Sequence, residues 1–439
     1  MDNTITLPPG YDATITSGNN RDADLPAYSS LSSMGQVVPQ NLTELSEGAP
    51  SKEFSYHISL KGNNSSASLV LYGNASLSKH SPAFLGGSRV NGLVKVNVES
   101  GESINAVVIS IQGKIISGSR QHIFLEYTQT LWSSSSDSHK SDGKLQGEHN
   151  WPFKLHFPKE VTLTVGTKDA PRVEVFHLPQ SFMERHAKAS IQYEVIARFA
   201  RGILKTDHRI IAPFVYIPII RPEPPSQLRS DAYERNTTIP GPIADPTGWH
   251  TLTSVQIQGK LFTRQATISC ILSLALPLSY TRGSVIPLHL VIQSNDTQAL
   301  ETLSSPHAII CRLRRILRYY PDENKTVDPK LRREELEHSE LATWWPFVES
   351  PSLEESSFQR TLSGEIILSP ELMPTTTIGR FQLEYSVVLF PFDANSFHSE
   401  NNDILSDCAV EIATAFPPGP RQRMNVQTAI PDRLRHAFQ

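Results

Sequence analysis

The chain has 439 residues and a formal net charge of −4, with 40 basic and 44 acidic side chains. This near-neutral balance argues against a nucleic-acid-binding protein that works through bulk positive charge. Only 38% of the residues are hydrophobic, and the 32 prolines exceed the usual share of about 5%. Length and composition together predict two globular domains with further segments outside their cores.

The three cysteines, Cys270, Cys311 and Cys408, are widely separated, so neither a disulfide framework nor a CxxC metal site is expected. The N-terminus has no basic stretch followed by an apolar one, which argues against a signal peptide. No window holds the ~18 consecutive apolar residues of a membrane-spanning helix. We therefore expect a cytoplasmic protein without a metal or other cofactor.

The first 54 residues are polar and lack hydrophobic periodicity, which predicts a disordered tail. This tail contains a complete PPxY motif and an LPxY variant, formed by Pro8, Pro9 and Tyr11 and by Leu25, Pro26 and Tyr28. A PPxY match is expected by chance only about 0.06 times in a chain of this composition. Proline pre-sets the polyproline II backbone that WW domains recognise, so the motifs predict docking of WW domains.

Residues 55–220 show the period-two alternation of strands with one buried face. The clearest run is 191–199, in which apolar residues alternate with Gln192, Glu194 and Arg198. The following segment, 221–250, is rich in proline and predicts a linker, because proline cannot donate a hydrogen bond within a central strand.

A second series of strand patterns occupies residues 251–415, including the alternating run Phe381–Leu389. Residues 319–360 interrupt this series as an insertion. Within the insertion the charged stretch Pro329–Thr343 predicts a surface helix, which Trp344 and Trp345 would seat on the body. Residues 416–439 predict a short tail. The two strand series predict an all-β protein with two tandem immunoglobulin-like sandwiches.

Several sequence segments resemble the arrestin family, and more closely the α-arrestin-like proteins of fungi. In the first half the resemblance rests on Gly92–Val98, Ile109–Lys114, Leu131–Trp132, Trp151–Pro158 and Ile191–Ala197. In the second half it rests on Leu276–Pro287 and Pro374–Gly379. Their order over residues 55–415 matches the family. The turn Ser279–Arg282, between Pro277 and Gly283, is equally well explained as a simple hairpin.

The resemblance implies an arrestin fold, which is a platform for membrane cargo and not an enzyme. In α-arrestins, PPxY motifs recruit HECT-type ubiquitin ligases, and the bound plasma-membrane transporter or receptor is ubiquitinated and endocytosed. This chain departs from animal relatives because its motifs precede the body. The expected function is therefore a cytoplasmic trafficking adaptor that can be recruited to the plasma membrane and endosomes. The alternative is a retromer-like sorting scaffold of arrestin fold that acts without a ligase.

Two basic clusters are candidate contacts for acidic cargo or anionic lipid. One consists of Arg198, Arg201, Lys205 and Arg209, and the other of Arg312, Arg314, Arg315 and Arg318. The simpler interpretation is that both are solvated charges that protect strand edges from aggregation.

Two further features have simple structural interpretations. The segment Leu389–Asp393 matches a clathrin-box pattern, but its leucine closes an alternating strand and is expected in the core. No catalytic motif stands out, since HExxH, GxSxG and phosphate-binding glycine loops are absent from the sequence. We therefore expect no enzymatic activity.

Overall fold

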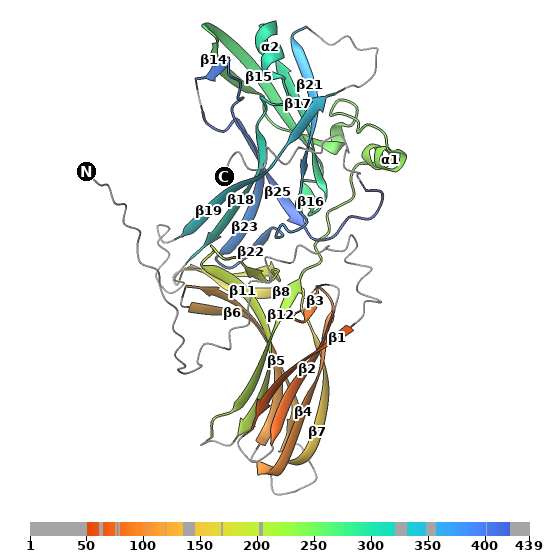
Figure 1. Ribbon diagram of the computed structural model, residues 1–439, viewed down its shortest axis with the longest axis vertical. Coiled ribbons are helices and arrows are strands. Elements are labelled where there is room, and N and C mark those ends of the chain that lie inside the picture. Colours follow the sequence, from red (N-terminus) through yellow and green to blue (C-terminus); the bar gives the residue numbers. More distant parts are fainter. Residues whose placement is uncertain are drawn as a thin grey trace, which may run out of the picture.

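The computed structural model describes residues 51–421, with gaps at 61–64, 75–76, 78–79, 103, 119, 135–144, 168–169, 202–204, 321–331, 348–356 and 401. The described chain is nearly all-β, which confirms the predicted class (Figure 1). Its sheets form two sandwich-like halves that lie end to end along the long axis, a first half (51–217) and a second half (249–413). No helix among the described residues is long and apolar enough to cross a membrane.

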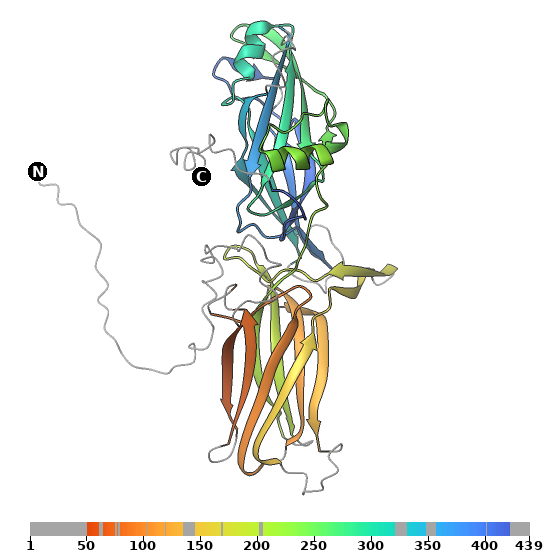
Figure 2. The same ribbon diagram turned by 90° about the vertical axis from the view of Figure 1, so that its right-hand side faces the viewer.

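Two sheets face each other in the first half (Figure 2). One has the order β1 (Ser51–Ser59), β2 (Ser66–Asn74), β4 (Arg89–Glu102), β7 (Leu145–His156). The other has the order β3 (Ala83–Leu85), β12 (His208–Ile217), β11 (Ala189–Arg201), β5 (Ile104–Ser117), β6 (Arg120–Ser133), with β10 (Phe182–Met183) paired to β11. A separate ribbon of β8 (Glu160–Thr167) and β9 (Ala170–His177) projects sideways near the second half.

Strand β11 shows why the alternating sequence forms this sheet. Ile191, Tyr193 and Val195 are buried, whereas Gln192 and Arg198 lie on the opposite face. Period-two patterning places the first set in the core and the second on the outer surface. Strand β11 pairs with β5 on one side and β12 on the other, so it lies in the middle of the sheet. Its polar residues therefore lie at the centre of the outer face of this sheet.

The second half repeats the two-sheet plan. One sheet has the order β20 (Thr343–Pro346), β21 (Gln359–Ile367), β17 (Val285–Gln293), β15 (Arg264–Ala275), β14 (Val255–Leu261), β24 (Phe397–Ser399), with β13 (Trp249–Thr251) paired to β15. The other has the order β16 (Ser279–Thr281), β25 (Ser406–Ala413), β23 (Phe381–Leu389), β18 (Cys311–Tyr319), β19 (Arg333–Leu341), with β22 (Thr376–Ile378) paired to β23. Helix α2 (Thr297–Leu303) begins at the capping side chain of Asp296.

Each half contains one short strand in a parallel pair, β3 with β12 and β16 with β25. Strand β16 lies in the connection between β15 and β17, which pair with each other in antiparallel fashion. The segment 276–284 is therefore more than the simple hairpin considered from the sequence. It crosses from one sheet to the other before the chain returns.

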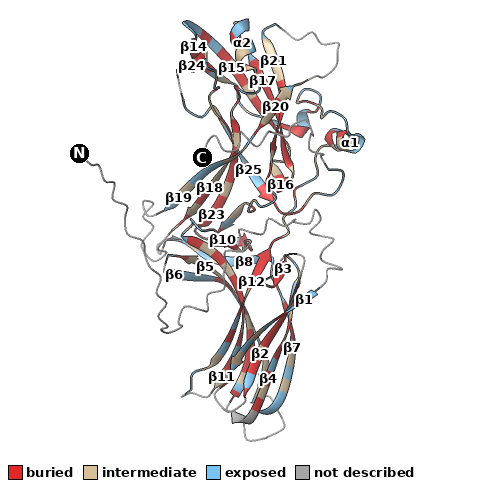
Figure 3. Ribbon diagram, viewed as in Figure 1, coloured by how far each residue is buried: buried red, intermediate tan, exposed pale blue. Residues whose placement is uncertain are grey.

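Most buried apolar residues belong to one contiguous cluster with members in both halves. Figure 3 shows buried residues along the strands of both halves. The rings of Phe182 and Phe381, both almost fully buried, meet edge to face between the halves with centroids 5.1 Å apart. Leu389 and Phe392 are also buried, which confirms that the clathrin-box pattern belongs to the core. The three cysteines are free and buried.

The proline-rich segment 221–250 contains structure that its composition did not predict. Helix α1 (Gln227–Arg235) begins after the capping Ser226, and a 3₁₀ turn, η2 (Pro246–Gly248), follows it. Helix α1 ends at Asn236, whose positive φ of 55° closes the helix in the left-handed conformation. This segment therefore covers one side of the second half as well as connecting the halves.

The predicted surface helix over Pro329–Thr343 is wrong. Among its described residues, β19 and the first residue of β20 are extended, and β19 pairs with β18 along its length. The glutamates of β19 favour a helix by propensity, but they face arginines of β18, and these cross-strand ion pairs favour the strand. Trp344 and Trp345 accordingly lie in β20 against β21, and they do not seat a helix.

Candidate functional site

The residues of the WW-docking motifs lie outside the part of the chain that the structure describes. These are Pro8, Pro9, Tyr11, Leu25, Pro26 and Tyr28. The first described strand, β1, begins at Ser51, so the motifs precede the body by more than twenty residues. The candidate site within the body consists of the two arginine clusters.

The first cluster lies at the ends of β11 and β12. Arg198 and Arg209 are directly opposite each other across the two strands, and both are exposed. Asp207 is shared between two residues of β11: its carboxylate lies 3.5 Å from the Arg198 guanidinium and accepts the Arg201 backbone N–H at 2.9 Å. Lys205 is exposed in the connection between the strands. The structure therefore places Arg198, Arg201 and Arg209 close together, with Lys205 in the connection between their strands.

Arg198 and Arg209 line a hollow of about 480 Å³ on the outer face of β5, β6, β11 and β12. Farther along this hollow, Lys114 forms an ion pair of 2.7 Å with Glu194, and Glu126 contributes a second carboxylate. The charges of Lys114 and Glu194 neutralise each other, and so do those of Arg198 and Asp207. Arg209 makes no ion pair with any residue that the structure describes, so the end of the hollow near Arg209 carries a positive charge.

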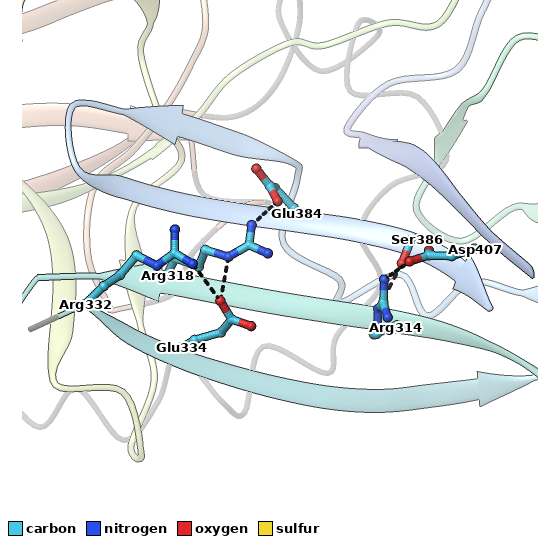
Figure 4. Close-up of polar contacts among 7 residues, drawn as sticks. All are labelled: Arg314, Arg318, Arg332, Glu334, Glu384, Ser386 and Asp407. Atoms are coloured by element: carbon cyan, nitrogen blue, oxygen red, sulfur yellow. Dashed lines mark hydrogen bonds and ion pairs between the residues drawn. The ribbon is translucent and has the colours of Figure 1, made fainter. Parts of the chain in front are cut away.

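The second cluster is held by carboxylates of neighbouring strands (Figure 4). Arg318 contacts Glu334 at 2.8 Å and also Glu384, so its guanidinium is placed between β19 and β23. Arg332 joins the same Glu334 at 3.1 Å. The hydrogen bond with Arg318 lowers the pKa of Glu334, and the reciprocal contact raises the pKa of Arg318.

Arg314 has a similar environment farther along β18. Its guanidinium contacts Asp407 of β25 and donates a hydrogen bond of 3.1 Å to the Ser386 hydroxyl (Figure 4). Arg312 is half-buried and makes no ion pair with a described residue. The positive charges that look alike in the sequence are thus mostly neutralised on this face, which reduces their attraction for an external anion.

Arg315 points the other way and connects the two halves. It lies 2.6 Å from Glu184 of the first half and 3.3 Å from Glu337 of β19. Burial lowers the pKa of the Arg315 guanidinium, but the charge and hydrogen bond of Glu184 outweigh it, so its pKa is raised. Arg315 is therefore an internal contact and not a surface charge.

A buried arginine between the halves, Arg282, was not predicted from the sequence. Arg282 donates hydrogen bonds of 3.2 Å to the Gln180 side chain and to the Leu372 carbonyl. Burial lowers the pKa of Arg282 to about 10. Its place in the turn after β16 was visible in the sequence, but its burial depends on Gln180, which lies about a hundred residues earlier.

Among the described residues, no group of three histidine, cysteine, aspartate or glutamate side chains could hold a metal ion. No family model matches the chain, and no curated protein matches it.

Proposed function

We propose that the protein is a non-enzymatic trafficking adaptor of arrestin fold. The observation that carries the proposal is the PPxY motif at Pro8–Tyr11, followed by the LPxY variant at Leu25–Tyr28. In an extended peptide, the spacing of these motifs would place a proline and a tyrosine on one side, as WW-domain grooves require. Two motifs in one segment allow bivalent binding to tandem WW domains, which raises avidity without new contacts.

The body supplies the second function of an adaptor, a surface for cargo. The two halves share a buried core and are joined through Phe182, Phe381 and the Arg315–Glu184 ion pair. A connected pair of sandwiches presents a long continuous surface for cargo. A HECT-type ubiquitin ligase bound at the motifs would be brought close to a plasma-membrane transporter or receptor bound on the body.

Of the two arginine clusters, the first is better suited to acidic cargo. Arg198 and Arg209 lie at the end of a hollow, and Arg209 has no carboxylate partner among the described residues. Arg314, Arg315 and Arg318 already contact carboxylates, so cargo binding there would have to break existing ion pairs. A negatively charged segment of a membrane protein would therefore bind at the first cluster.

The motif assignment is tested with the full chain and isolated WW domains of a HECT-type ligase. We expect the wild type to be retained on immobilised WW domains. The double variant Tyr11→Ala, Tyr28→Ala should not be retained. Tyr127→Ala is the matched control, because Tyr127 is 47% exposed on β6 and no proline precedes it in a motif. Undiminished binding of the double variant would contradict the assignment.

The cargo surface is tested separately in cells. Arg209→Glu should slow ubiquitination and uptake of the cargo while leaving WW binding intact, because it reverses charge at the hollow and not in the motifs. Glu126→Gln, at the other part of the hollow, is the control. Normal cargo turnover after deletion of residues 1–54 would instead favour a sorting scaffold that needs no ligase.

A further inference from the structure

A second hollow lies on the side of the second half that is covered by the segment 221–250. Its walls are helix α1 with the residues before it, the connection that contains β16, and residues 416–421. Its volume of about 690 Å³ falls within the range of ligand-binding pockets. Prolines form much of the lining, namely Pro222, Pro225, Pro277, Pro287, Pro417 and Pro420. The ring of Phe416 adds to this apolar surface.

One charged side chain in this hollow lacks an opposite charge. Arg229 of α1 is 2% exposed and donates one hydrogen bond of 3.2 Å to the Gly248 carbonyl. Its Nε has no hydrogen-bond partner, and the guanidinium makes no ion pair, among the residues that the structure describes. Asp245 precedes Gly248 by three residues, but it lies beyond ion-pair distance and accepts hydrogen bonds from the Ser226 and Thr247 side chains.

A buried guanidinium without a carboxylate is costly, because the desolvation penalty of an unpaired ion is several kcal/mol. A carboxylate that enters the hollow would offset this penalty by its charge and by accepting a hydrogen bond from the guanidinium. Glu223 and Glu234 also line the hollow and are exposed. Arg421 lines it as well, with its guanidinium over the Phe416 ring. The two arginines and two glutamates balance, so a single carboxylate with apolar neighbours fits better than a dense polyanion.

Strand β16 supplies a polar edge in the same wall. It is the terminal strand of its sheet and pairs only with β25 among the described strands. A terminal strand offers backbone groups to which an extended peptide can add. The charge of Arg229, the apolar lining and this edge all select the same kind of ligand.

We propose that this hollow binds an extended peptide segment of a partner protein, with one Asp or Glu carboxylate on Arg229 and apolar side chains against the prolines and Phe416. This site is independent of the WW-docking motifs and of the hollow at Arg209. It would give the protein a second mode of recognition, specific for an acidic residue between apolar ones.

The test selects ligands from phage-displayed random decapeptides on the full chain. We expect enriched sequences to share one Asp or Glu flanked by apolar residues. The best peptide and its Gln or Asn counterpart are then compared by fluorescence polarisation, with an expected loss of about tenfold or more in affinity. No enrichment, enrichment without a carboxylate, or equal affinity for the two peptides would overturn the proposal.

Three variants locate the binding. Arg229→Met and Ser279→Phe should each weaken the acidic peptide by about tenfold or more, the first by removing the cation and the second by filling the hollow. Arg235→Gln is the matched control on the same helix, because Arg235 is exposed and does not line the hollow. Unchanged binding to both Arg229→Met and Ser279→Phe would contradict the assignment.

The melting temperature of the free protein separates a ligand site from a structural role. Replacing an unpaired buried charge by an apolar residue of similar length should leave the melting temperature unchanged or raise it. A lower melting temperature of Arg229→Met with normal peptide affinity would show that the guanidinium is structural. Peptide binding that appears only after deletion of residues 422–439 would assign the hollow to the chain's own C-terminal segment. This result would overturn the proposal that a partner protein binds there.

Discussion

Replacing Phe182 by alanine tests whether the two halves stabilise each other. Phe182 is 2% exposed, and its ring packs edge to face on Phe381 of the second half at 5.1 Å. Removing a buried phenylalanine side chain lowers the free energy of unfolding by about 3–5 kcal/mol. About 0.5–1.5 kcal/mol of such a loss reflects the geometry of an aromatic pair beyond simple burial. Because the partner ring belongs to the other half, the substitution should lower the stability of both halves.

The assay is urea unfolding followed by tryptophan fluorescence, since each half has its own tryptophans. Trp132 and Trp151 report on the first half, and Trp249 and Trp344 on the second, in variants that keep one pair at a time. We expect Phe182→Ala to lower the transition midpoints of both halves. The matched control is an alanine at the buried Phe84, which packs on a ring of its own half and should destabilise that half alone. A shift confined to the first half, or a total loss below about 1 kcal/mol, would refute the coupling.

Three further predictions concern single sites. Burial lowers the pKa of His289 to about 4, so below pH 6.5 the unfolded chain binds a proton at this residue while the folded chain keeps it neutral. The free energy of unfolding should therefore fall by up to about 3 kcal/mol between pH 6.5 and 4. Urea titrations at several pH values should show a weaker pH dependence of stability for His289→Leu. Gly92→Ala should cost about 1–3 kcal/mol in the same titrations at neutral pH, because its Cβ would lie 2.5 Å from the Val70 carbonyl oxygen. Glu384→Gln should cost about 1 kcal/mol or less, with the difference shrinking in high salt, because its ion pair with Arg318 is partly exposed.

The sequence was sufficient to predict the strand class wherever one face of a strand is buried and the other is not. In β11 and β23 the apolar positions of the alternation are buried, and the exceptions are Glu194, Ser386 and Val388, which are buried on the opposite face. The same reasoning failed for β19, where four glutamates and two leucines in nine residues favour a helix by local propensity. The choice of strand depends on arginines of β18, which lie about twenty residues earlier, and their pairing with β19 was not visible from local propensity.

The charged residues show a similar limit. Arg198 and Arg209 are eleven residues apart, and a hairpin of neighbouring strands placed them together as the sequence suggested. Burial could not be predicted for Arg229 and Arg282, because it depends on segments distant in the chain. Arg282 is covered by Gln180 of the first half, and Arg229 lies beneath the loop that ends at Gly248. A cluster of basic residues in the sequence therefore predicted one candidate surface, whereas the unpaired cation Arg229 of the second hollow could be recognised only from the folded structure.

The two arginine clusters differ in whether a bound anion would have to displace a carboxylate that already contacts the arginine. At Arg318 a ligand carboxylate would displace Glu334 or Glu384, so most of the Coulombic gain would be cancelled by the contact that is lost. At Arg209 no described carboxylate has to leave, but the site is exposed and its attraction is screened by salt. At Arg229 neither cost applies, because the cation is buried and unpaired. Under the two proposals, we therefore expect the exposed Arg209 to attract acidic cargo at long range and the buried Arg229 to discriminate between a carboxylate and an amide.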